Sequence, residues 1–172
     1  NYLKIINDYK PEVLRGYPNS IFELAKFTID RNISTPSIKA ILTTAEKLHK
    51  EYRKEIELAF DAPVFDCYGA GDGSALAAEC KMHNGLHIDS ELSIIEILDE
   101  NNNNIKGKRG KMIATSLVND SFPFIRYEIG DLGILSTTKC SCGIAHPLLE
   151  EISGRDLEFL KRKDGTLIPG LY

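Results

Sequence analysis

The hydrophobic pattern of this chain changes character near residue 85, and that change constrains the fold more than any other feature. Before it, short apolar runs at residues 38–42 and 63–68 alternate with stretches of helical periodicity. Strand–helix–strand order with tight loops is typical of a parallel α/β sheet. After it, isoleucine-rich segments are punctuated by glycines. We therefore predict an α/β fold: a parallel α/β lobe over 1–85, a small β-rich lobe over 86–153, and a hinge into a further domain over 154–172.

Two helices are expected in the first lobe. Asn19 and Ser20 are residue types that cap helices, and the apolar positions that follow recur at helical spacing, namely Ile21, Leu24, Ala25, Thr28 and Ile29. Thr43 with Glu46 three residues on matches a capping box, which predicts that the second helix begins at Thr43. Its buried stripe would consist of Ala45, Leu48, Tyr52, Ile56 and Ala59.

The second half is predicted as a succession of short strands. Residues 92–98, 111–117, 124–127 and 132–136 are apolar or alternating, and glycines separate them. Residues 101–104 are four asparagines, which tolerate left-handed backbone and therefore predict a turn. We expect a small antiparallel sheet or a distorted barrel here.

Bulk composition narrows the classes of function. The chain has 172 residues and a net charge of -4, which disfavours a nucleic-acid binder. It holds no 18-residue apolar run, so no membrane partner is expected. Its four cysteines fit a reducing cytosol better than a disulfide scaffold, so we expect a cytoplasmic protein. The chain begins at Asn1 and stops at Tyr172, and both ends read as cut from something longer. The sequence leaves the oligomeric state open.

Two glycine-punctuated loops carry candidate nucleotide-binding residues. Tyr68-Gly69-Ala70-Gly71-Asp72 follows a predicted strand, where an α/β sheet places its ligand crevice, although such a loop can equally be an ordinary turn. Asp131 follows Gly130 and could accept hydrogen bonds from ribose hydroxyls, or merely cap a turn. Arg126 and Arg155 could bind phosphate or form structural ion pairs.

A second constellation suggests a metal site. Cys140 and Cys142 place two thiols across a tight turn, while Cys80 and His87 flank Gly85, which can bend the chain back. Three sulfurs and one imidazole suit structural Zn²⁺ in tetrahedral geometry. His146 is a rival fourth ligand and His83 a weaker one, whereas Cys67 lies on a predicted strand and reads as core. The alternative is four ordinary reduced cysteines.

In order and nearly end to end, the chain resembles the phenylacetate–coenzyme A ligase-like family and its CapK-related members, within the adenylate-forming superfamily. The matching stretches are residues 16–20, 43–46, 66–69, 77–80, 85–87, 115–117, 122–127, 130–132, 140–143 and 154–155. The resemblance implies part of the N-terminal domain of such an enzyme. It also places the Cys/His pattern in several members.

The resemblance implies roles for particular residues. Tyr68 would flank adenine, with Gly69 beside it. Asp131 would bind the ribose hydroxyls, and Arg155 would sit near the phosphate or ribose. Asp72 would stand where the family has a Mg²⁺-holding glutamate, but an aspartate is one methylene shorter. The adenine would be lined by Asp66 and by the Thr43–Glu46 loop, which includes Thr44 and Ala45, and residues 16–20 would border the carboxylate pocket.

The implied activity is ATP-dependent activation of an aryl or acyl carboxylate as acyl-AMP, followed by transfer to coenzyme A. ATP, Mg²⁺ and structural Zn²⁺ are the implied cofactors. The family's phosphate loop would lie upstream of Asn1 and its lysine-bearing domain downstream of Tyr172, so we expect this stretch to be inactive alone. After Gly154-Arg155 the family often has x-Asp-Asp, and here Asp156-Leu157-Glu158 stands instead. The alternatives are adenylation of a coenzyme or saccharide-related acceptor, and a non-catalytic zinc-stapled binding module.

Overall fold

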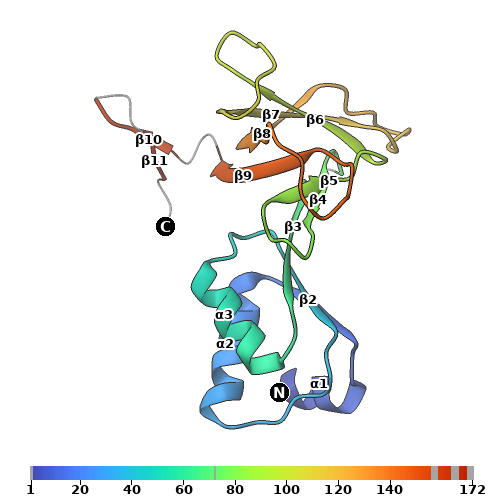
Figure 1. Ribbon diagram of the computed structural model, residues 1–172, viewed down its shortest axis with the longest axis vertical. Coiled ribbons are helices and arrows are strands. Elements are labelled where there is room, and N and C mark those ends of the chain that lie inside the picture. The colour runs from blue at the N-terminus through green and yellow to red at the C-terminus, as the bar shows by residue number, and fades with distance from the viewer. Residues whose placement is uncertain (1, 72, 156–158, 164–166, 170–172) are drawn as a thin grey trace. The chain divides into compact units, whose positions relative to one another are not determined.

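The computed structural model describes residues 2–71, 73–155, 159–163 and 167–169, which belong to two compact units, Asn1–Tyr68 and Gly69–Tyr172 (Figure 1). We describe each unit by itself. These two units are defined by packing within the chain. They are a different division from the predicted lobes, whose bounds at residues 85 and 153 stay predictions.

The first unit is a parallel α/β layer. Its elements are α1 (Tyr2–Tyr9), β1 (Val13–Gly16), α2 (Pro18–Asp30), β2 (Ala40–Thr44), α3 (Lys50–Phe60) and β3 (Val64–Gly69). The strands run parallel in the order β1-β2-β3, and Ile41 of β2 pairs with Val64 of β3. Helices α2 and α3 lie side by side (Figure 1). The prediction of strand–helix–strand units in a parallel sheet is therefore confirmed.

The core of this unit comes from alternate strand residues and one stripe of each helix. Ile41, Val64, Ile56 and Ala25 are fully buried. Burying each large aliphatic side chain contributes about 1.5–3 kcal/mol. The predicted α2 stripe holds at Ile21, Ala25 and Thr28, but Ile29 is 42% exposed and lies outside it.

Both predicted helix starts were wrong. Helix α2 begins at Pro18, with Tyr17 as its N-cap, because the fixed φ of proline suits the first helical turn. Asn19 and Ser20 therefore lie inside the helix. Thr43 is a buried residue of β2, and α3 begins only at Lys50 after His49. The pairing of β2 with β3 places Thr43 in a strand, and this tertiary interaction overrides the local capping-box pattern.

The second unit is antiparallel. Its strands are β4 (Leu76–Glu79), β5 (Leu86–Ile88), β6 (Ser93–Leu98), β7 (Arg109–Ser116), β8 (Tyr127–Leu135), β9 (Leu148–Arg155), β10 (Phe159–Lys161) and β11 (Leu167–Pro169). The order is β4-β5-β9-β8-β7-β6 with antiparallel neighbours, and β10 pairs separately with β11. The predicted antiparallel sheet is confirmed. Within the described ranges no pairing joins β6 to β4, so the sheet is open and shows no barrel.

Sequence patterns located some of these strands better than others. The predicted strand at 92–98 matches β6, and 111–117 matches β7. Residues 124–126 are a loop rather than a strand, held where the Phe124 carbonyl accepts the Ser116 N–H at 2.9 Å. The asparagine turn is confirmed: the Asp99 carboxylate accepts backbone N–H groups from Asn101 and Asn103. These hydrogen bonds lower the pKa of Asp99, and the one from the Asn103 backbone has the largest effect.

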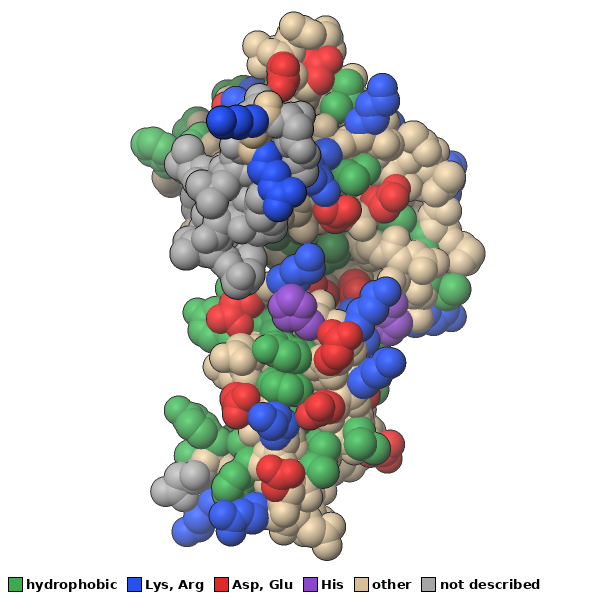
Figure 2. Space-filling model, turned by 90° about the vertical axis from the view of Figure 1, so that its left-hand side faces the viewer, with side chains coloured by type: hydrophobic (Ala, Val, Ile, Leu, Met, Phe, Trp, Pro, Cys, Tyr) green, Lys and Arg blue, Asp and Glu red, His purple; other side chains and the backbone are tan. Residues whose placement is uncertain are grey.

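The surface carries mixed charge. Figure 2 shows lysine and arginine side chains interspersed with aspartate and glutamate over the face that it presents. Among the described residues, every helix is too short or too polar to cross a bilayer.

Candidate functional site

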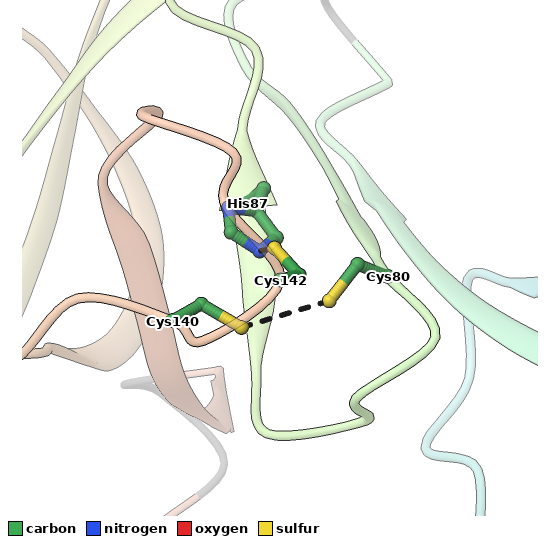
Figure 3. A group of neighbouring side chains, drawn as sticks. All are labelled: Cys80, His87, Cys140 and Cys142. Atoms are coloured by element: carbon green, nitrogen blue, oxygen red, sulfur yellow. Dashed lines mark hydrogen bonds between the residues drawn. The ribbon is translucent and has the colours of Figure 1, made fainter.

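The four residues of the predicted metal set meet at one point in the second unit. Cys80 directly follows β4 and His87 lies in β5, so both belong to one hairpin. Cys140 and Cys142 lie in the loop between β8 and β9. Figure 3 shows their side chains converging from these two segments, which are far apart in sequence.

The distances within this Cys3His cluster (Cys80, His87, Cys140 and Cys142) are close to those of a coordination shell. The four ligand atoms all lie within 4.8 Å of one another. The Sγ atoms of Cys80 and Cys140 are 3.7 Å apart, and Cys142 Sγ lies 3.3 Å from His87 Nε2. Two sulfurs bound at about 2.3 Å to one tetrahedral Zn²⁺ would be ~3.8 Å apart. The separation of the Cys80 and Cys140 sulfurs matches this value, and the donor set of three thiols and one imidazole fits structural zinc.

Local hydrogen bonds prepare the thiols for a cation. The N–H of Met82 donates to Cys80 Sγ and that of Ile144 to Cys142 Sγ, each at 3.4 Å. A hydrogen bond from the Cys142 backbone lowers the pKa of Cys140 to about 7, whereas burial raises the pKa of Cys80. A thiolate is the form that binds metal, so Cys140 is available near neutral pH.

The geometry also decides between the candidate imidazoles. His87 is buried and turns Nε2 to the sulfurs, while its Nδ1 has no hydrogen-bond partner among the described residues. His83 instead pairs through Nδ1 with Glu79 at 3.0 Å. Within the described part of the chain, His146 is absent from the cluster. Cys67 lies in β3, in the other unit, as a half-buried residue.

A second set of predicted residues lies at the carboxyl ends of two parallel strands in the first unit. Thr44 ends β2 and pairs in register with Cys67 of β3, one residue before Tyr68. Ala45 follows with a left-handed backbone, φ 70°. The carboxyl ends of parallel strands are where open α/β sheets bind ligands.

Hydrogen bonds fix two acids at this edge. Thr43 Oγ1 donates to Asp66 Oδ1 at 2.9 Å, and Glu46 Oε2 accepts the Asn19 backbone N–H at 3.3 Å. Glu46 is therefore not a capping-box residue of α3, but a link between the loop after β2 and the start of α2. Gly69 ends β3 and is exposed.

The predicted ribose and phosphate residues meet in the second unit. Asp131 of β8 is 8% exposed, and its Oδ1 lies 3.2 Å from Arg155 Nε of β9. Arg155 Nη1 also donates to the Ile129 carbonyl at 2.8 Å. Gly130 has φ +86°, and a Cβ there would come within 3.4 Å of Arg155 Nη1. The left-handed φ at Gly130, which favours glycine, lies directly before Asp131.

The remaining candidates fall elsewhere. Asp72 lies outside the described residues. Arg126 was predicted either to bind phosphate or to form a structural ion pair, and it forms the ion pair, with Nε 3.0 Å from Glu96 Oε2. Of residues 16–20, Gly16, Asn19 and Ser20 border a groove in the first unit, of about 770 Å³, whose apolar lining includes Leu3, Leu14 and Phe27.

Thr43 was predicted both to cap a helix and to belong to the adenine-lining loop. The structure shows that it orients the carboxylate of Asp66 across the β2–β3 pair, a contact that sequence reasoning did not predict. The apolar run before Thr43 was the available signal, because it predicted a strand that would place Thr43 at the strand's end.

Solved structures define the class to which this fold corresponds. A 2-hydroxyisobutyryl-CoA ligase, solved in an open conformation in complex with 2-HIB-AMP and CoA, superposes with a TM-score of 0.78 at 23% identity, covering 97% of this chain and 41% of that one. The anthranilate CoA ligase AuaEII, in complex with anthranoyl-AMP, gives 0.76 at 12% identity, covering 98% of this chain and 34% of that one. At such identities the likeness shows the fold alone: a mixed α/β fold that matches part of adenylate-forming CoA ligases.

Sequence comparison identifies particular relatives. Protein CapK of Staphylococcus aureus is 29% identical over 171 residues, which is 97% of this chain and 36% of CapK. A phenylacetate-coenzyme A ligase of Thermus thermophilus is 28% identical over 163 residues, 91% of this chain and 37% of that protein. The phenylacetate-coenzyme A ligase of Escherichia coli is 26% identical over 176 residues, which is 96% of this chain and 39% of that protein. No protein-family model matches.

The chain is thus a distant homologue of CapK and of the phenylacetate-coenzyme A ligases, which confirms the resemblance drawn from its motifs. It spans a little over a third of the length of the curated relatives it matches, 36% of CapK.

Proposed function

We propose that this chain is part of an ATP-dependent ligase that activates an aryl or acyl carboxylate as acyl-AMP, with coenzyme A as the later acceptor. The supporting observation is that candidate nucleotide residues stand at the carboxyl ends of adjacent parallel strands, in a chain distantly homologous to such ligases. The parallel layer would belong to the ligase's N-terminal domain.

In this proposal each group of residues holds a different part of the nucleotide. Tyr68 would lie against the adenine, which Thr44, Ala45, Glu46, Asp66 and Gly69 would line. Asp131 would accept hydrogen bonds from the ribose hydroxyls, with Arg155 beside it at 3.2 Å. A carboxylate acceptor makes the stronger, charge-assisted kind of hydrogen bond.

The chemistry would be attack of a substrate carboxylate on the α-phosphorus of ATP, which releases pyrophosphate and leaves acyl-AMP. A carboxylate is already ionised at neutral pH, so no general base is required. Catalysis would consist of positioning and charge neutralisation, to which Mg²⁺ contributes and for which Asp72 is our proposed ligand. The coenzyme A thiol would then displace AMP.

The Cys3His cluster would hold Zn²⁺ as a structural ion. Three thiolates and one imidazole fill a tetrahedral shell and leave no position for substrate. Its role would be to join the β4–β5 hairpin to the β8–β9 loop, next to β8 and β9, which carry Asp131 and Arg155.

The test is nucleotide discrimination at the ribose in the natural full-length gene product. If Asp131 grips the vicinal hydroxyls, ATP should bind more tightly than 2′,3′-dideoxy-ATP by about tenfold or more, the value of a hydrogen bond to a charged group. Asp131→Asn should weaken ATP binding and erase most of that preference. Isothermal titration with both nucleotides measures the two effects.

Asp30→Asn is the matched control, because Asp30 is an exposed acid at the end of α2. It should leave both affinities unchanged. Equal discrimination by the wild type and Asp131→Asn would remove Asp131 from the ribose site and with it this form of the proposal.

The cluster supports a second candidate, a zinc-stapled binding module without turnover, because the metal set is complete within the second unit. A chelator that lowers the melting temperature of the full-length protein, while ATP fails to raise it, would favour this candidate.

A further inference from the structure

Two sulfurs of the Cys3His cluster, from segments far apart in sequence, lie within reach of each other. Cys142 Sγ lies beside His87 Nε2 at 3.3 Å, whereas Cys80 and Cys140 face each other, Sγ to Sγ, at 3.7 Å (Figure 3). That separation exceeds the ~2.05 Å of a disulfide bond, so both are free thiols. All three cysteines are half-buried, so a small oxidant can reach them.

We propose that Cys80 and Cys140 form a selective oxidation site: in the metal-free protein, a peroxide converts this pair into a reversible disulfide. The bond would join the same two segments that zinc joins, the β4–β5 hairpin and the β8–β9 loop. The inference uses the geometry of the cluster only. It is therefore independent of ATP binding, and its failure would leave the ligase proposal untouched.

The reaction balances with hydrogen peroxide as the oxidant. One thiolate attacks the peroxide O–O bond, forming a sulfenic acid and releasing hydroxide. The second thiolate then attacks the sulfenic sulfur, forming the S–S bond and releasing the second hydroxide. The two sulfurs give up two electrons, which the two peroxide oxygens gain, and two protons from the original thiols complete two waters.

Two other pairings are less favourable on geometric grounds, and a third, Cys80 with Cys142, lies within the same cluster and is distinguished by the peptide map below. A bond between Cys140 and Cys142 would close a ring over the single residue Ser141, and disulfides tolerate such distortion poorly. Cys67 belongs to the other compact unit and has no place in the cluster. Bound zinc should protect the pair, because each thiolate then donates its electrons to the metal.

The test begins with the reduced, metal-stripped chain treated with a stoichiometric amount of hydrogen peroxide. Remaining thiols are alkylated, and non-reduced peptides are mapped by mass spectrometry. The expected result is one dominant cross-link, Cys80 to Cys140, which dithiothreitol reverses. Cys142→Ser and Cys67→Ser should retain it, and Cys140→Ser should abolish it. Zinc-loaded protein should form the Cys80–Cys140 cross-link at least about tenfold more slowly, and a chelator should restore the original rate.

Mapping the wild-type chain keeps the test decisive even if a variant folds poorly. A dominant Cys80–Cys142, Cys140–Cys142 or Cys67-containing cross-link would overturn the proposal. So would irreversible sulfinic or sulfonic acids at Cys80 or Cys140 in place of a disulfide, and so would cross-linking at the same rate with and without zinc.

Discussion

The Cys3His cluster and the proposed nucleotide residues differ in how they are distributed over the two compact units. All four cluster residues belong to the second unit, and their ligand atoms lie within 4.8 Å of one another. The nucleotide residues are divided, with Thr44, Asp66 and Tyr68 in the first unit and Asp131 and Arg155 in the second. The cluster can therefore be tested through one unit, whereas the nucleotide proposal needs the natural full-length gene product.

The largest effect expected is that of zinc removal. If the cluster binds Zn²⁺ in the folded state only, free zinc at about a thousand times its Kd adds roughly 4 kcal/mol to the free energy of unfolding. Denaturant titration of zinc-loaded and chelator-treated chain measures it, with added zinc as the recovery step.

Cys67→Ser serves as the control for this experiment, because Cys67 lies outside the cluster, and it should keep the full response to zinc. Identical unfolding curves with and without zinc would mean that the four side chains meet without holding a metal.

The next largest effect is predicted for Gly85→Ala, in the turn that leads into β5 and His87. Gly85 has φ +124°, and a Cβ there would collide with the backbone oxygen of Leu149 and come within 3.2 Å of Leu148 Cγ. Backbone strain and steric overlap together should cost about 2–4 kcal/mol of unfolding free energy and weaken zinc binding.

Gly71→Ala is its matched control, since no atom lies within 4 Å of the Cβ it would add and no left-handed φ is required. Its effect on unfolding should stay within about 0.5 kcal/mol. Comparable losses in the two variants would show that the turn at Gly85 is not restricted as described.

Asp131→Asn should have a smaller effect on stability. The change removes the charge that pairs with Arg155, but the arginine side chain is 57% exposed, so water compensates for much of the loss. We expect a decrease of about 1 kcal/mol in the free energy of unfolding. A near-native unfolding curve would allow a loss of ribose discrimination to be assigned to nucleotide contact, whereas a collapse of stability would make Asp131 mainly structural.

The smallest effect is predicted for Glu96→Gln, at another arginine–carboxylate pair of this unit. Arg126 is 59% exposed in this pair, and such surface pairs are worth about 0.2–1 kcal/mol. ATP affinity of the full-length protein should not change. A large loss of affinity would give Arg126 a nucleotide role rather than the structural one.

How far the sequence alone could predict these features depended on the range of the interactions. The parallel layer followed from local periodicity, since Ile41 and Val64 lie in apolar runs long enough to identify as strands. Strands β4 and β5 were missed because they are short, and the pairing of β5 with β9 brings in residues far along the chain.

The same distinction explains the sites. The sequence could predict which residue types would bind zinc, but the choice of His87 over His146 required the register of β5 beside the β8–β9 loop. Glu46 was open to two interpretations, and only the placement of Thr43 in a strand excluded the capping box. For Asp131, sequence reasoning could not foresee that its carboxylate would pair with Arg155, because the two lie on neighbouring strands joined by a long connection.

The most direct test of the ligase proposal is ATP–pyrophosphate exchange by the natural full-length gene product, assayed across a panel of aryl and acyl carboxylic acids. The proposal predicts exchange that depends on one class of acid, with acyl-AMP formed and coenzyme A consuming it. Absence of acid-dependent exchange in folded, zinc-replete protein, or AMP found attached to an alcohol or sugar acceptor instead, would contradict it.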